Sequence, residues 1–324
     1  MVRKVEISHK TIIFAVFFVI TLWFLFFIRD LIFQLFVALI IMATFNPFVT
    51  RLQKYKIPRV ASVILVYALF VGVIGGAFFA LIPHLAEQTA SFVSSLPRLM
   101  VQLGVPVIFR DQILEQLLAQ VGAVPSQLAK ALASVFSNVF AVITVFIFSF
   151  YLLLSRDKLD DQLGYFFGED KREKIDKIID HLEVRMGSWA RGEAILMFIV
   201  GLSTYIGLRL LSVPFALPLA ILAGILEIIP YIGPIVSAIP AVVIGFGISP
   251  ITGLATTALA FLIQQLENYI LVPKIMQTST GINPIVTLFA LTVGFRLAGI
   301  IGGLLSIPIV ITLQVVFKEY FQAK

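Results

Sequence analysis

The chain has 324 residues, of which 60% are apolar and only 13% are charged, and its mean hydropathy is +1.04. Because soluble domains carry about 25% charged residues, this composition excludes an ordinary water-soluble core. In a soluble protein the net charge of +6 would suggest nucleic acid as a partner, but here the basic residues lie at the ends of apolar runs, which indicates membrane topology instead. The chain has no cysteine, which excludes disulfides, cysteine nucleophiles and thiolate metal sites.

Apolar runs without Asp, Glu, Lys or Arg recur along the whole chain, at residues 11–28, 31–50, 60–86, 131–155, 194–208, 210–226, 228–266, 275–295 and 297–317. A helix needs about 20 apolar residues to cross a bilayer, and most of these runs have a similar length or more. An outer-membrane barrel would instead show alternating segments of about ten residues, which this sequence lacks. We therefore predict an all-α, polytopic helical membrane protein.

The basic residues predict the topology, because Lys and Arg mark cytoplasmic loops. They cluster before residue 11, in 51–59 and in 156–192, whereas the turn at 29–30 and the segment 84–134 contain few. We expect five parts: three spans in 1–83, an extracytoplasmic amphipathic helical segment in 84–134, a fourth span in 135–155, a cytoplasmic amphipathic helix in 156–192, and a transport core in 193–324. The helix in 156–192 should lie along the membrane interface and lead into a span that begins near Glu193.

The segment 215–247 reads as a helix broken in its middle by Pro230, Gly233 and Pro234. Proline in a helix interior costs about 3 kcal/mol, and freed backbone groups at membrane depth need protein or a water-filled cavity to satisfy them. The simplest form is a re-entrant hairpin of two half-helices with this Pro/Gly cluster at its tip.

A similar segment follows at 284–318. When Pro218 is aligned with Pro284, Gly233 falls opposite Gly299, and the second break includes Gly302 and Gly303. Two matching Gly/Pro-interrupted segments are the best sequence indication of a transporter's binding site. Hairpins that enter from opposite faces, an inverted repeat, also leave both termini in the cytoplasm. The alternative is a pair of ordinary kinked crossings.

Few charged residues lie within the apolar surroundings of the core. We expect Glu227 to end a half-helix and to act as a protonatable coupling or substrate group, because membrane-depth charges usually face a bundle interior or cavity. A structural ion pair with Arg296 at the meeting point of the two tips is the alternative. Gln264, Glu267 and Asn268 share helical spacing and predict a polar stripe that lines a path or docks on the hairpins.

Three segments together resemble the autoinducer-2 exporter family, also called PerM-like: residues 189–240, which end in "LEIIPYIGPIVSAIP", then "QQLENYILVPKIM" (264–276) and "GINPIVTLFALTVGFRLAGIIGGLLSIPIV" (281–310). The resemblance implies a homo-oligomeric secondary transporter of the cytoplasmic membrane, with a pentamer as one form. It also implies export of autoinducer-2 or sodium/proton antiport. Its motif positions carry over to Glu227, Pro230, Gly233, Pro234, Glu267, Asn268, Pro273 and Gly299, which define the family rather than a substrate.

We therefore expect a secondary transporter that exports a small polar molecule of the autoinducer-2 type, driven by an ion gradient. A sodium/proton antiporter and a passive oligomeric pore remain alternatives. We expect no cofactor and no bound metal, and no nucleotide-binding motif indicates a primary pump. An intramembrane enzyme lacks its residues, since the histidines and aspartates lie in loops or at span ends.

Overall fold

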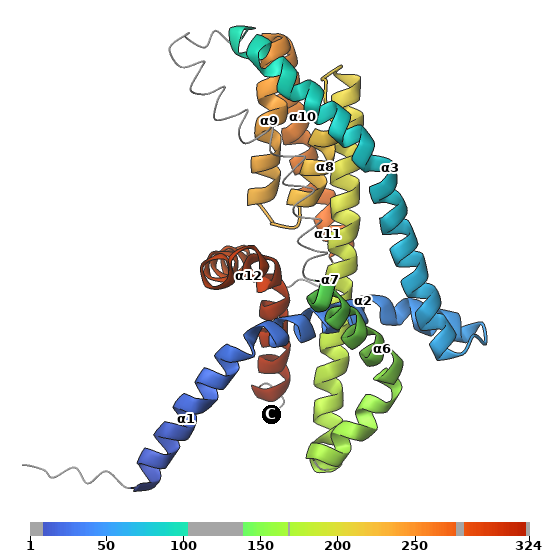
Figure 1. Ribbon diagram of the computed structural model, residues 1–324, viewed down its shortest axis with the longest axis vertical. Coiled ribbons are helices and arrows are strands. Elements are labelled where there is room, and N and C mark those ends of the chain that lie inside the picture. Colours follow the sequence, from blue (N-terminus) through green and yellow to red (C-terminus); the bar gives the residue numbers. More distant parts are fainter. Residues whose placement is uncertain (1–8, 103–138, 168, 277–281, 322–324) are drawn as a thin grey trace, which may run out of the picture.

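A computed structural model describes residues 9–102, 139–167, 169–276 and 282–321, and this part of the chain is helical and contains no strand (Figure 1). The helices are α1 (His9–Phe27), α2 (Arg29–Lys54), α3 (Arg59–Gln102), α6 (Val139–Phe167), α7 (Glu169–Leu210), α8 (Ala216–Leu226), α9 (Ile232–Ile248), α10 (Pro250–Leu266), a π-helical turn η1 (Glu267–Leu271), α11 (Val272–Ile275) and α12 (Pro284–Phe321). Within the described ranges, six helices are long and apolar enough to cross a membrane. The predicted all-α polytopic membrane protein is confirmed.

Helix α7 is the helix against which most of the others pack. At 1.5 Å per residue its 42 residues extend about 60 Å, and Figure 1 shows it running in one direction throughout. Its C-terminal half packs against α8 and α10, and its N-terminal half packs against α2, α6 and the end of α12. Residues 156–192 belong to α6 and α7 and lead directly into the apolar half of α7. Their predicted position along the cytoplasmic interface stays a prediction.

Charged side chains hold the N-terminal half of α7 in this position. The guanidinium of Arg156 on α6 donates to Asp180 and to Glu183 on α7, each at 2.5 Å. The amide of Asn46 on α2 donates to the same Glu183. The Glu183 carboxylate, 12% exposed, therefore joins α7 to α6 and α2, whereas the Asp180 side chain is 64% exposed.

Helix α3 continues without interruption to Gln102, through Pro83 and Pro97. The described part of 84–134 is thus an extension of the third span rather than a set of short separate helices. The remainder of that predicted segment, and the N-terminus before His9, lie outside the described residues.

Residues 215–247 form two short helices, α8 and α9, which pack against each other and are joined by the break at 227–231. Pro230 lies within the break, and Tyr231 has a positive φ of 65°. Gly233 enables the close return of the chain, since a Cβ there would lie 1.8 Å from the carbonyl oxygen of Leu226. Glycines also let α7 approach α8, where a Cβ on Gly224 would lie 2.7 Å from the carbonyl oxygen of Met197.

Helix α12 bends sharply at Ala298 and Gly299, where Gly299 has φ 59° and ψ −142° (Figure 1). The two arms touch beside this elbow, because a Cβ on Gly294 would lie 2.3 Å from the carbonyl oxygen of Gly302. Gly302 and Gly303 are therefore packing positions within the second arm, not part of the tip as predicted. The second arm packs on α7 through Ile307, Ile311 and Val315.

The predicted meeting of the two breaks does not occur in this structure. Helix α12 packs chiefly against α7, whereas the break at 227–231 lies between α8 and α9 (Figure 1). The reason is the apolar face of the second arm, which packs beside Met186 and Trp189 in the N-terminal half of α7.

Candidate functional site

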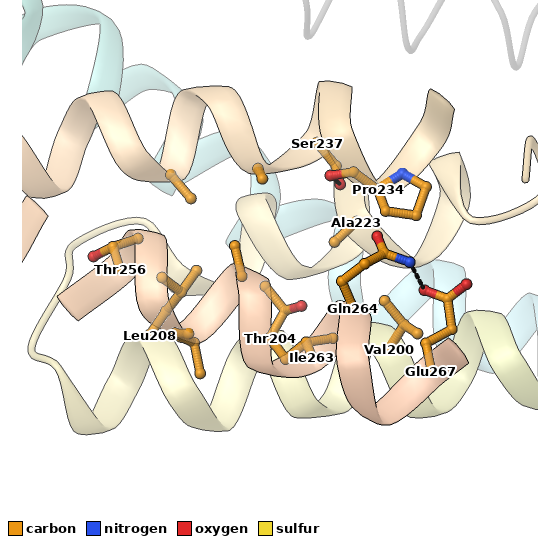
Figure 2. A pocket seen from close by; sticks show the side chains of 14 residues that line it. Val200, Thr204, Leu208, Ala223, Pro234, Ser237, Thr256, Ile263, Gln264 and Glu267 are labelled. Atoms are coloured by element: carbon orange, nitrogen blue, oxygen red, sulfur yellow. Dashed lines mark hydrogen bonds between the residues drawn. The ribbon is translucent and has the colours of Figure 1, made fainter. Parts of the chain in front are cut away.

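A cavity lies between α7, α9 and α10, next to the break in the hairpin (Figure 2). Its volume is about 50 Å³, which is enough for a few water molecules but far below the roughly 300–1,000 Å³ of a typical small-molecule site. Small and hydroxyl side chains make up half of its lining: Thr204, Ala223, Ser237, Ala238, Ala241, Thr256 and Ala260. Two larger polar groups, Gln264 and Glu267, close one end.

Gln264 and Glu267 form a hydrogen-bonded pair in this cavity. The side-chain amide of Gln264 donates to Oε2 of Glu267 at 2.9 Å, and Figure 2 shows both across from Pro234 and Ser237. Glu267 is only 6% exposed and is the first residue of η1. Single π-helical turns inside α-helices are rare and frequently occur at functional sites, which singles out this carboxylate.

Glu227 lies at the C-terminal end of α8, as the sequence predicted, and is 3% exposed. Its carboxyl group lies beside that of Glu267, close enough for the two groups to interact directly. Its Oε2 is buried and accepts no hydrogen bond from the part of the chain that the structure describes. A hydrogen bond between two carboxyl groups needs a proton on one of them, because ionised carboxylates only accept.

Glu193 on α7 is a third buried carboxylate, 5% exposed, and it was not among the predicted site residues. It lies close enough to Glu227 and Glu267 for their charges to interact. The sequence does indicate that Glu193 is buried. Glu193 directly precedes the apolar run 194–208, where a charge is costly unless it faces a bundle interior.

No cation neutralises this cluster within the described ranges. Arg296 is exposed on α12 and makes no ion pair there, so the predicted pairing with Glu227 is not formed. Asn268 is exposed and does not line the cavity, since the π-helical turn begins at Glu267 and the preceding α-helical spacing ends there. The arrangement therefore joins Gln264 and Glu267, but not Asn268, to Glu227.

The predicted hinge residues near Glu227 have distinct positions. Pro230 lies in the break, Gly233 is the close contact in the first turn of α9, and Pro234 lines the cavity. Among the described residues, no group of three or more His, Cys, Asp or Glu side chains could hold a metal ion. Buried carboxyl groups of this kind can bind and release a proton.

Comparison with known proteins supports the family that the motifs indicated. A family model described as AI-2E family transporter matches residues 12–322. YueF of Bacillus subtilis (strain 168) is 28% identical over 319 residues, which cover 92% of this chain and 85% of YueF. YrrI of the same organism is 23% identical over 312 residues, with 92% and 88% covered. A protein of Thermotoga maritima is 26% identical over 270 residues, with 82% and 81% covered. All three are named as candidate transport proteins, and this chain belongs to the AI-2E family of transporters.

Proposed function

We propose that this protein is a secondary transporter of the cytoplasmic membrane that moves a small polar solute, of the autoinducer-2 type, in exchange for protons. The observation that carries the proposal is the buried contact between Glu227 and Glu267 at the break between α8 and α9. A proton on this pair removes an uncompensated charge from an apolar region. The site therefore has one charge when the proton is bound and another when it is released, so the two states of a transport cycle can differ in charge.

The cavity provides the path from this pair toward solute. Gln264 and Glu267 both line the cavity, and Gln264 donates a hydrogen bond to Glu267. Glu227 lies beside Glu267. Since the cavity holds only a few waters, a solute of metabolite size requires α9 and α10 to separate from α7. Outward movement of the short α8–α9 hairpin is the simplest way to open it.

The small cavity also favours a second candidate, sodium/proton antiport. A space of about 50 Å³ suits a partly hydrated ion better than an organic molecule. The same carboxyl pair would then bind sodium and protons in turn. Homo-oligomerisation belongs to the proposal through the family resemblance alone.

Purified protein in proteoliposomes tests these functions with a panel of solutes under imposed proton or sodium gradients. A proton-coupled exporter gives saturable solute uptake that follows the proton gradient. An antiporter gives sodium-dependent proton movement without any added solute. Flux that rises linearly with solute concentration and ignores both gradients would contradict coupled transport and favour a passive pore.

A further inference from the structure

A second cavity, of about 90 Å³, lies between the N-terminal half of α7 and the end of α12. Its lining consists of His181 and Arg185 from α7 and of Val315, Lys318 and Glu319 from α12. The ring of His181 is 2.8 Å through Nδ1 from Oε1 of Glu319, which engages the one acidic group of this lining. Two basic groups, Arg185 and Lys318, remain around the same space.

Arg185 is the distinctive member of this lining. Its side chain is partly buried, yet it forms no hydrogen bond or ion pair within the described ranges. A guanidinium in such a position is normally paired with a carboxylate or phosphate, because its rigid fork of donors suits both anions. The nearest candidate in the lining, Glu319, is bound to His181 instead.

We propose that this cavity binds the phosphate of an anionic phospholipid headgroup, held by Arg185 and Lys318. A lipid is favoured over free phosphate because the chain neighbours of these two residues are exposed and apolar: Val184 is 58% exposed and Phe317 is 60% exposed. A headgroup in the cavity would place its acyl chains over this apolar surface. In other membrane proteins, basic pockets between transmembrane helices on the cytoplasmic side bind anionic headgroups. The basic residues of 156–192 predict that this cavity also lies on the cytoplasmic side.

Native mass spectrometry of the full chain, reconstituted in mixed phosphatidylglycerol and phosphatidylcholine, tests the proposal. The wild-type protein should retain phosphatidylglycerol in preference. Arg185→Ala/Lys318→Ala should reduce this retention at least about tenfold, because it removes both charge-assisted contacts to the phosphate. Arg51→Ala/Lys54→Ala is the matched control, because it removes the same two charges from exposed positions outside the cavity and should retain the lipid.

If the loss of Arg185 disturbs folding, the single variant Lys318→Ala still tests the site, because Lys318 is exposed and its loss should not affect folding. This single variant should lose part of the retention with an unchanged melting temperature. Equal retention by the control and cavity variants would overturn the site. A melting-temperature increase with inorganic phosphate, without any preference for phosphatidylglycerol, would overturn the lipid as its ligand.

Discussion

The carboxyl group of Glu227 at the end of α8 contacts that of Glu267 at the start of the π-helical turn, and both side chains are at least nine-tenths buried. Glu193 lies near both. Two local irregularities thus meet: a helix end at Glu227 and a wide turn at Glu267. Each is unfavourable by itself in an apolar environment, and such departures from local rules concentrate at functional or strained sites.

Gly233→Ala should destabilise the α8–α9 hairpin by about 1–3 kcal/mol. Its Cβ would lie 1.8 Å from the carbonyl oxygen of Leu226, and backbone at that distance has to move. The midpoint of thermal unfolding in detergent measures the effect. Gly72→Ala is the matched control: its Cβ has no atom within 4 Å, so its unfolding midpoint should stay the same or rise. Equal midpoints for the two variants would argue against a tight return of the chain at Gly233.

Gly299→Ala should change the angle of the α12 elbow. The conformation of φ 59° and ψ −142° is almost restricted to glycine, and an alanine there costs about 1–3 kcal/mol of strain. Because the chain has no native cysteine, spin labels at Thr292→Cys and Leu313→Cys report the distance between the two arms directly. The distance distribution should shift or broaden in Gly299→Ala and stay unchanged in Ala298→Gly. An unaltered distribution in Gly299→Ala would mean that the elbow does not depend on this residue.

Arg156→Ala should destabilise the bundle by about 3 kcal/mol, because removal of one partner leaves the Glu183 carboxylate, 12% exposed, without its main charge partner. Lys177→Ala breaks a pair with Glu173 whose side chains are 60% and 83% exposed, and it should have little effect. Thermal unfolding of the two variants side by side gives the comparison. A smaller loss in Arg156→Ala than in Lys177→Ala would contradict the role of the charged contacts between α6 and α7.

Ala260→Leu should abolish transport with the fold retained, since the added side chain fills a cavity of only about 50 Å³ between α7, α9 and α10. Ala258→Leu places the same side chain on the exposed face of the same helix and should transport normally. Initial rates of solute or ion flux in proteoliposomes distinguish the two. Normal flux in Ala260→Leu would remove this cavity from the transport path.

The sequence was sufficient to predict the helical membrane architecture and the break near Glu227. Charge-free runs of membrane length and proline in a helix interior act locally, so composition and spacing reveal them. The positions of Glu227 at a helix end and of Gln264 beside Glu267 follow from such local rules.

Relations between distant segments could not be predicted in the same way. The proximity of Glu193 to the pair depends on how α7 packs against α8. Arg296 lies elsewhere because the second arm of α12 packs on the N-terminal half of α7. The exposure of Asn268 depends on a π-helical turn that ideal helical spacing does not anticipate. The ion pairs of Arg156 with Asp180 and Glu183 likewise join α6 to α7 across 24 and 27 residues of sequence.

Proton movement in proteoliposomes that carry Glu227→Gln tests the central claim most directly. The amide has the same shape and cannot exchange a proton, so proton movement driven by a solute or sodium gradient should cease while the unfolding midpoint stays near that of the wild type. Glu173→Gln, the same change at an exposed side chain away from the site, should move protons normally. Proton movement by Glu227→Gln at the rate of Glu173→Gln would contradict the account.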